Sequence, residues 1–277
     1  MEPVPSLTIR DPEMKTDKGA GRAMTEVVIV ASAFGAEAVR RDGHERWLDV
    51  AAEAGASGFE VRRELFRDDA QASLASLARL GSEIGGRGLW CVYSTPAGLY
   101  DEVGNLDAAA LAEAQAAADA LGARFLKMQL GAFTGRAAVP TLTATIAGAR
   151  ARLLVENGQR PEDGTPRRFC AWFEALAGEG AAPLAGMTFD IGNWHWTGTA
   201  PVDAARMLGR HVEYIHCKAV RGSGTRRYPV APAPEDGRFA EIFRSLPHAV
   251  PRGIEFPFDS VDLSGDARRR VAWLAHV

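Results

Sequence analysis

The sequence predicts a single-domain α/β protein that folds as a (β/α)8 TIM barrel. Short apolar runs alternate with helical patterns eight times, and strands that alternate with helices form parallel sheets. The length of 277 residues is close to that of one such barrel. No stretch has the composition of a linker, so we expect no second domain. Eight units favour the closed barrel over an open doubly wound sheet.

The composition is that of a globular protein with a large core and no need of disulfides, since 47% of the residues are hydrophobic and 24% are charged. A net charge of −3 provides no basic field for nucleic acid or for an anionic membrane, and no apolar run is long enough to span a bilayer. Cys91, Cys170 and Cys217 are far apart and form no CxxC pair. We expect free thiols in a reducing cytoplasm.

The expected strands are short apolar or β-branched runs at residues 26–34, 58–62, 89–94, 124–130, 153–156, 187–190, 212–218 and 253–256. The expected helices lie at residues 36–54, 70–84, 107–121, 141–150, 166–177, 201–208, 239–246 and 263–277. Gly55 and Gly122 end two of these helices, Asp107 caps one, and Pro201 begins another. Residues 1–23 lack the apolar segment of a secretory signal, and we expect a flexible N-terminal extension before a barrel of residues 24–277.

Along several of the expected strands, polar residues occupy every second position and apolar residues occupy the positions between them. We call this alternation the parity of a residue in its strand. Because side chains alternate across a strand, the apolar set should pack on the helices and the polar set should face the barrel interior. Unpaired charge is costly to bury, so charges gathered there indicate a metal, a polar ligand or both. The inward set comprises Glu60, Lys127, Gln129, Glu156, Asp190, His216, Lys218 and Glu255.

Four of these residues stand at the ends of the last four strands, where an α/β barrel places its chemistry. Glu156 precedes Asn-Gly, Asp190 precedes Ile-Gly-Asn, His216 precedes Cys-Lys, and Glu255 ends the final strand. Three carboxylates and one imidazole at neighbouring strand ends can hold one divalent metal. Any one acid alone would more often cap a following helix.

This order of strand ends resembles the xylose isomerase-like barrels, specifically the sugar phosphate isomerase/epimerase family. The resemblance spans residues 24–277, with its specific matches in the last four strands. It implies that Glu156, Asp190, His216 and Glu255 bind one divalent metal, often Mn²⁺, with Mg²⁺, Co²⁺ and Zn²⁺ as alternatives. It also implies a small-molecule sugar substrate.

Within that family, ketose 3-epimerases tend to carry a histidine three residues after the strand-six aspartate. Here Asn193 stands at that position and His195 two residues further, and the arginine that follows the strand-seven histidine is only loosely matched by Arg221. The related endonuclease IV branch needs histidines on the early strands for several zinc ions. Strands two, three and four have none here, which argues against DNA repair.

The expected activity is that of a metal-dependent isomerase or epimerase acting through an enediolate, with Glu156 and Glu255 as the base and acid. We expect substrate contacts from Lys127, Asn193, His195, Lys218 and Glu60, although Glu60 is about as well explained by a salt bridge with Arg62, Arg63 or a lysine in the barrel interior. A metal-dependent dehydratase or lyase acting on a keto-sugar or keto-inositol uses the same intermediate and remains an alternative. A non-catalytic carbohydrate-binding barrel is disfavoured by the inward carboxylates. The sequence leaves open a homo-oligomer.

Overall fold

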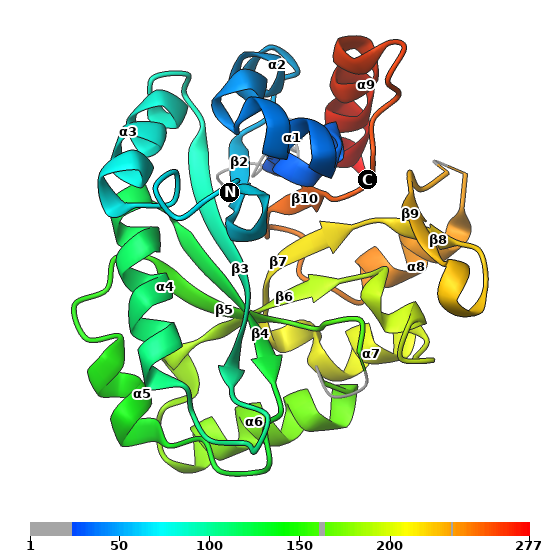
Figure 1. The fold of residues 1–277 in the computed structure, drawn as a ribbon. Helices are drawn as coiled ribbons and strands as arrows, with labels where there is room; N and C mark the ends of the chain where they lie inside the picture. Colours follow the sequence, from blue (N-terminus) through cyan, green and yellow to red (C-terminus); the bar gives the residue numbers. More distant parts are fainter. Residues whose placement is uncertain (1–23, 161–163, 234) are drawn as a thin grey trace, which may run out of the picture.

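Eight parallel strands close into a barrel in the computed structural model of the protein, with helices packed around the outside (Figure 1). The structure describes residues 24–160, 164–233 and 235–277. The predicted extension, residues 1–23, lies outside them. Around the barrel the strand order is β1-β10-β7-β6-β5-β4-β3-β2, so the first and last barrel strands pair and close the sheet. The predicted TIM barrel is confirmed.

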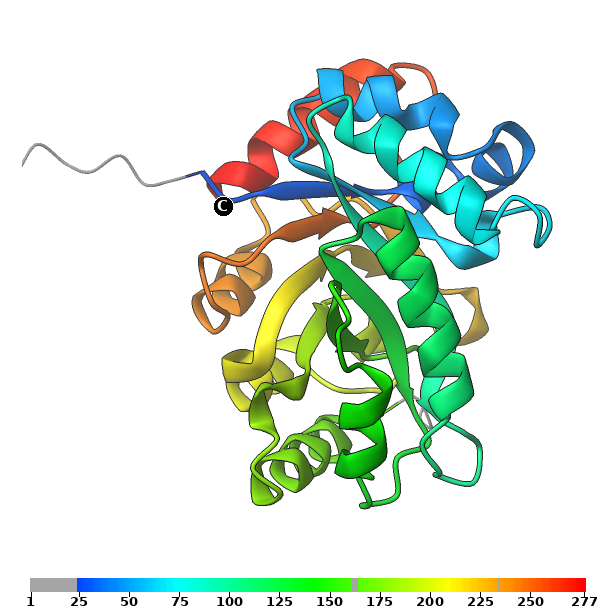
Figure 2. The same ribbon diagram turned by 90° about the vertical axis from the view of Figure 1, so that its left-hand side faces the viewer.

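The barrel strands are β1 Val27–Val30, β2 Gly58–Arg62, β3 Trp90–Tyr100, β4 Phe125–Gly131, β5 Arg152–Glu156, β6 Gly186–Asp190, β7 Val212–Cys217 and β10 Arg252–Ile254. The helices are α1 Ala36–Asp42, α2 Leu48–Glu53, α3 Leu74–Gly85, α4 Ala108–Leu121, α5 Val139–Thr145, α6 Pro166–Gly178, α7 Pro201–Leu208, α8 Gly237–Arg244 and α9 Leu263–His276. A turn by 90° shows the helices as an outer layer around the strands (Figure 2).

The barrel interior has two levels. Its lower level is an apolar and aromatic cluster separate from the large core between strands and helices, formed by Val28, Val92, Phe125, Leu154 and Tyr214. The upper level, toward the carboxyl ends of the strands, carries polar residues of the predicted parity. Lys127, for example, is 1% exposed and turns inward to two carboxylates. The parity argument is therefore correct at this position.

Several elements differ from their expected form. The first predicted helix is divided into α1 and α2, since Gly43 between them has a φ of +85°, which favours glycine. Strand β3 continues to Tyr100 although Pro96 and Gly98 read as a turn, because β3 resumes pairing with β4 after a register shift between Ser94 and Gly98. Helix α5 ends at Thr145, five residues before the predicted end.

No strand or helix is expected between residues 219 and 238, but the segment after β7 forms an antiparallel hairpin. Its strands are β8 Ala219–Arg221 and β9 Tyr228–Val230, and it projects beside α7 and α8 (Figure 1). In the part of the chain that the structure describes, no helix has both the length and the apolar character needed to cross a bilayer.

Candidate metal centre and its surroundings

Four predicted ligands meet at the carboxyl-terminal mouth of the barrel. Glu156 ends β5, Asp190 ends β6, His216 lies in β7, and Glu255 directly follows β10. One side-chain ligand atom from each lies within 4.8 Å of the others. Hard divalent cations take ligands at about 2.0–2.6 Å, so atoms on opposite sides of such an ion are roughly 4–5 Å apart. The spacing fits one ion.

The imidazole of His216 lies at the centre of this group and is fully buried. Its Nδ1 is 2.8 Å from Oε1 of Glu156, 3.1 Å from Oε2 of Glu255 and 3.8 Å from Oδ2 of Asp190. The ring thus presents one nitrogen to all three carboxylates.

Three of the buried ligand atoms accept or donate no hydrogen bond within the part of the chain that the structure describes, so they are available to bind an ion. Oε1 of Glu156, Oδ2 of Asp190 and Nδ1 of His216 are buried and make no hydrogen bond among the described residues. Their close neighbours are one another and, for Asp190, the ammonium of Lys218 at 2.7 Å. Buried polar atoms without hydrogen bonds are uncommon, and a site for an ion is one accepted reason for them. The donor set therefore fits a divalent cation.

Three cations surround the carboxylates. Lys127 pairs with Glu156 and lies 3.8 Å from Glu60. Lys218 lies 2.7 Å from Oε2 of Glu255, and Arg62 lies 2.5 Å from the other oxygen of Glu255. The three cations come from β2, β4 and the residue after β7, and they balance most of the buried negative charge.

The cations change the acidity of the carboxyl groups. Burial alone would raise the pKa of Glu255, but Lys218, His216 and Arg62 outweigh it and hold that pKa well below its usual range. Glu156 is also lowered in pKa, because Lys127 and His216 outweigh its burial. For Asp190 burial prevails over Lys218, and its pKa is raised. Glu156 and Glu255 are therefore ionised at neutral pH and able to accept a proton.

A network of amides holds Asp190 in place. Asn157, after β5, accepts from the backbone N–H of Asp190 at 2.9 Å and donates to its carbonyl at 3.0 Å. The N–H of Asn193 donates to Oδ1 of Asp190 at 2.9 Å, and the Asn193 amide donates to the Asn157 carbonyl at 2.7 Å. Oδ1 is thereby occupied, and Oδ2 is left to face His216 and Lys218.

Above the cluster an open pocket of about 380 Å³ leads to solvent. Glu156 and Glu255 form part of its wall, so a small molecule in the pocket would touch both proposed acid–base groups. The lining residues also include cationic and amide side chains suited to hydroxyl or carbonyl groups: Arg62, Gln129, Gln159, Asn193 and Lys218.

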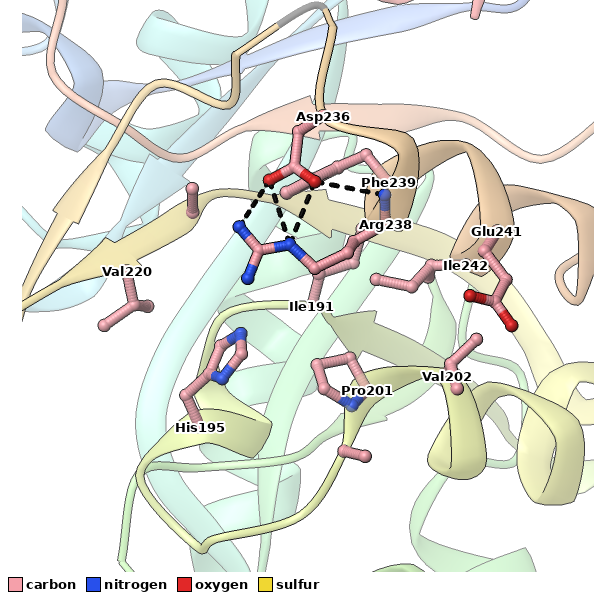
Figure 3. A pocket seen from close by; sticks show the side chains of 12 residues that line it. Ile191, His195, Pro201, Val202, Val220, Asp236, Arg238, Phe239, Glu241 and Ile242 are labelled. Carbon is pink, nitrogen blue, oxygen red and sulfur yellow. Dashed lines mark hydrogen bonds and ion pairs between the residues drawn. The ribbon is translucent and has the colours of Figure 1, made fainter.

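The other expected substrate contacts lie elsewhere. Glu60 and Lys127 are buried beneath the ligand carboxylates and do not line this pocket. His195 lines a different, mostly apolar pocket between the loop after β6 and helix α8 (Figure 3). Its ring lies near Ile191 and Pro201, and burial lowers its pKa. None of these three residues lines the pocket above the four ligands, and their contact with substrate stays a prediction.

Two residues of the site were underrated from the sequence. Arg62 was considered only as a partner for Glu60, yet its side chain pairs with Glu255 and Glu64. Asn157 was treated only as part of a strand-end pattern, yet it fixes Asp190. Arg62 lies two residues after Glu60 on β2, so the alternation of side chains already indicated that it faces the barrel interior.

Gly253 is needed for the aromatic side chains to approach β10. A Cβ at this position would collide with the hydroxyl of Tyr214 and lie 2.9 Å from Cδ2 of His216. We expect Gly253→Ala to destabilise the protein by about 1–3 kcal/mol, the usual cost of overpacking a core. Urea unfolding measures this. Gly178→Ala, where no atom lies within 4 Å, should be neutral or stabilising. Equal stability of Gly253→Ala and wild type would mean that the rings move aside without cost.

No protein-family profile matches this sequence, and no curated protein sequence matches it. Solved structures do. A D-psicose 3-epimerase from Clostridium cellulolyticum H10 is 10% identical with a TM-score of 0.66, and the match covers 91% of this chain and 99% of that one. The probable 3-DHS dehydratase AsbF from Bacillus anthracis is 14% identical with a TM-score of 0.62, covering 90% and 98%.

A xylose isomerase domain-containing protein from Salmonella typhimurium LT2 is 13% identical with a TM-score of 0.61, covering 92% of this chain and 99% of that one. At such identities the likeness concerns the fold. The chain has the fold of the xylose isomerase-like barrels over almost its whole length, as the resemblance of its strand ends implied.

Proposed function

We propose that this protein is a divalent-metal-dependent isomerase or epimerase of a small sugar or sugar derivative. The observation that carries the proposal is the convergence of Glu156, Asp190, His216 and Glu255 beneath an open polar pocket. The likeness to a D-psicose 3-epimerase supports a ketose-like substrate. Three free cysteines suit a reducing compartment such as the cytoplasm.

Mn²⁺ is the proposed ion, with Mg²⁺, Co²⁺ or Zn²⁺ as alternatives. When bound, such an ion would act as a Lewis acid toward substrate oxygens and favour the enediolate. Glu156, Asp190, Glu255 and Nδ1 of His216 would hold it. A carboxylate-rich set with one imidazole suits Mn²⁺ better than a thiolate-preferring metal.

The proton transfers are assigned to Glu156 and Glu255. Both carboxylates line the pocket and both are kept ionised by neighbouring cations, so either can accept the proton next to the substrate carbonyl. In an epimerisation the second group returns a proton to the opposite face. Lys218 and Asn193, which also line the pocket, would orient substrate oxygens.

A dehydratase or lyase is the second candidate, because the same proton abstraction precedes loss of water. Asn193 in place of the histidine expected of ketose 3-epimerases favours it, and so does the likeness to a probable dehydratase. Deuterium incorporation next to the carbonyl of ketoses and keto-inositols, followed by NMR with Mn²⁺ and after chelation, separates the two. Exchange with an isomeric product supports the isomerase. Loss of water supports the lyase. No exchange with a bound metal contradicts both.

A further inference from the structure

Glu60 is a buried carboxylate that neither lines the pocket nor offers an oxygen to the proposed ion. It lies on β2, across the barrel from β7, and is fully buried. Its Oε2 lies 2.7 Å from Nε2 of His216, on the side of the ring opposite the ligand carboxylates, and accepts a hydrogen bond from the hydroxyl of Tyr214 at 3.0 Å.

The position of Glu60 decides which nitrogen of His216 keeps its proton. Oε2 of Glu60 already accepts from the hydroxyl of Tyr214, and the ammonium of Lys127 lies 3.8 Å from its other oxygen, so the carboxylate faces donors and acts as an acceptor toward the ring. The Nε2 side of the ring must therefore donate. Nδ1, which faces Glu156, Glu255 and Asp190, is then the nitrogen whose lone pair is available to an ion.

We infer that Glu60 is a positioning residue that fixes the tautomer and ring orientation of His216 for metal binding through Nδ1. The inference rests on the proposed metal site. Carboxylates that accept from the distal nitrogen of a ligating histidine hold the ring in place and raise its basicity. Tyr214 and Lys127 in turn hold Glu60, by the hydroxyl contact and by an ammonium at 3.8 Å.

The test compares Mn²⁺ affinity and the ¹⁴N coupling of the bound ion, which electron spin-echo envelope modulation detects when an imidazole coordinates Mn²⁺. Glu60→Leu removes both the charge and the acceptor, and we expect affinity to fall about 10–100-fold with the ¹⁴N coupling altered or lost. Glu60→Gln retains an acceptor oxygen, so we expect a smaller loss with the coupling kept. Glu213→Gln is the matched control, since Glu213 also lies on a barrel strand but pairs with Arg152.

A purely structural role would lower the melting temperature of Glu60→Leu while leaving affinity and ¹⁴N coupling at wild-type values, and that result overturns the inference. If Glu60→Leu does not fold, Glu60→Gln decides: an affinity within about twofold of wild type and of the control overturns it. Should wild-type protein bind no Mn²⁺, the proposed metal site fails and the role of Glu60 with it. Wild-type binding with unchanged Glu60 variants contradicts the role of Glu60 alone.

Discussion

Glu255→Gln should slow the exchange of the substrate α-proton with deuterated solvent by about 10²–10⁴-fold, the usual contribution of a general base. The amide keeps the size of the side chain and one oxygen that can ligate an ion, but it cannot accept the proton. It also places an NH2 group against Arg62 or Lys218. In the wild-type protein Arg62 lies 2.5 Å from one carboxylate oxygen and Lys218 lies 2.7 Å from the other. We therefore expect metal binding to weaken but to persist.

Isothermal titration with Mn²⁺ and NMR of the exchange reaction measure the two effects separately. Glu64→Gln is the matched control, because Glu64 also pairs with Arg62 but is not among the four proposed ligands. That variant should retain both properties. Full exchange in Glu255→Gln would move the base to Glu156, the other carboxylate in the pocket wall.

His216→Ala should weaken Mn²⁺ binding by at least about 100-fold, since loss of a residue that only supports a ligand already costs 10–100-fold. The substitution removes the imidazole that lies within 3.1 Å of both Glu156 and Glu255, and it leaves those carboxylates closer to net repulsion. Added ion should restore part of the activity, because mass action can offset a weaker binding equilibrium but cannot replace a missing base.

The measurement is Mn²⁺ titration, followed by activity as a function of ion concentration. His248→Ala serves as the control, because His248 has an exposed side chain and is not among the four proposed ligands, so its loss should not change affinity. Wild-type affinity in His216→Ala would remove His216 from the ligand set and leave a carboxylate-only site.

The strand order and the ligand positions could be predicted because both follow from local rules. Apolar runs too short for helices indicated the strands, and period-two alternation placed Lys127 and His216 on the inward face. Parallel strands share one mouth, so residues at strand ends such as Asp190 and Glu255 had to approach one another once the barrel closed. The prediction of the ligand cluster therefore depended only on the prediction of a closed parallel barrel.

Contacts across the barrel could not be predicted in the same way. Alternation along a strand gives the face of a side chain but not its height or its partner, so it could not show that Glu60 and Lys127 are buried and do not line the pocket. His195 follows a strand end by five residues, and the turn between them carries it to another pocket. The hairpin of β8 and β9 was missed because its glycines and prolines resemble a loop.

The charges of the site are divided between the two halves of the chain. The proposed ligands all come from β5 to β10, whereas Arg62 and Lys127, which neutralise Glu255 and Glu156, come from β2 and β4. A second half that folded first would gather carboxylates without these counter-ions, and uncompensated buried charge costs several kcal/mol. The halves therefore gain their full stability only together, and we expect the barrel to unfold in one cooperative transition rather than half by half.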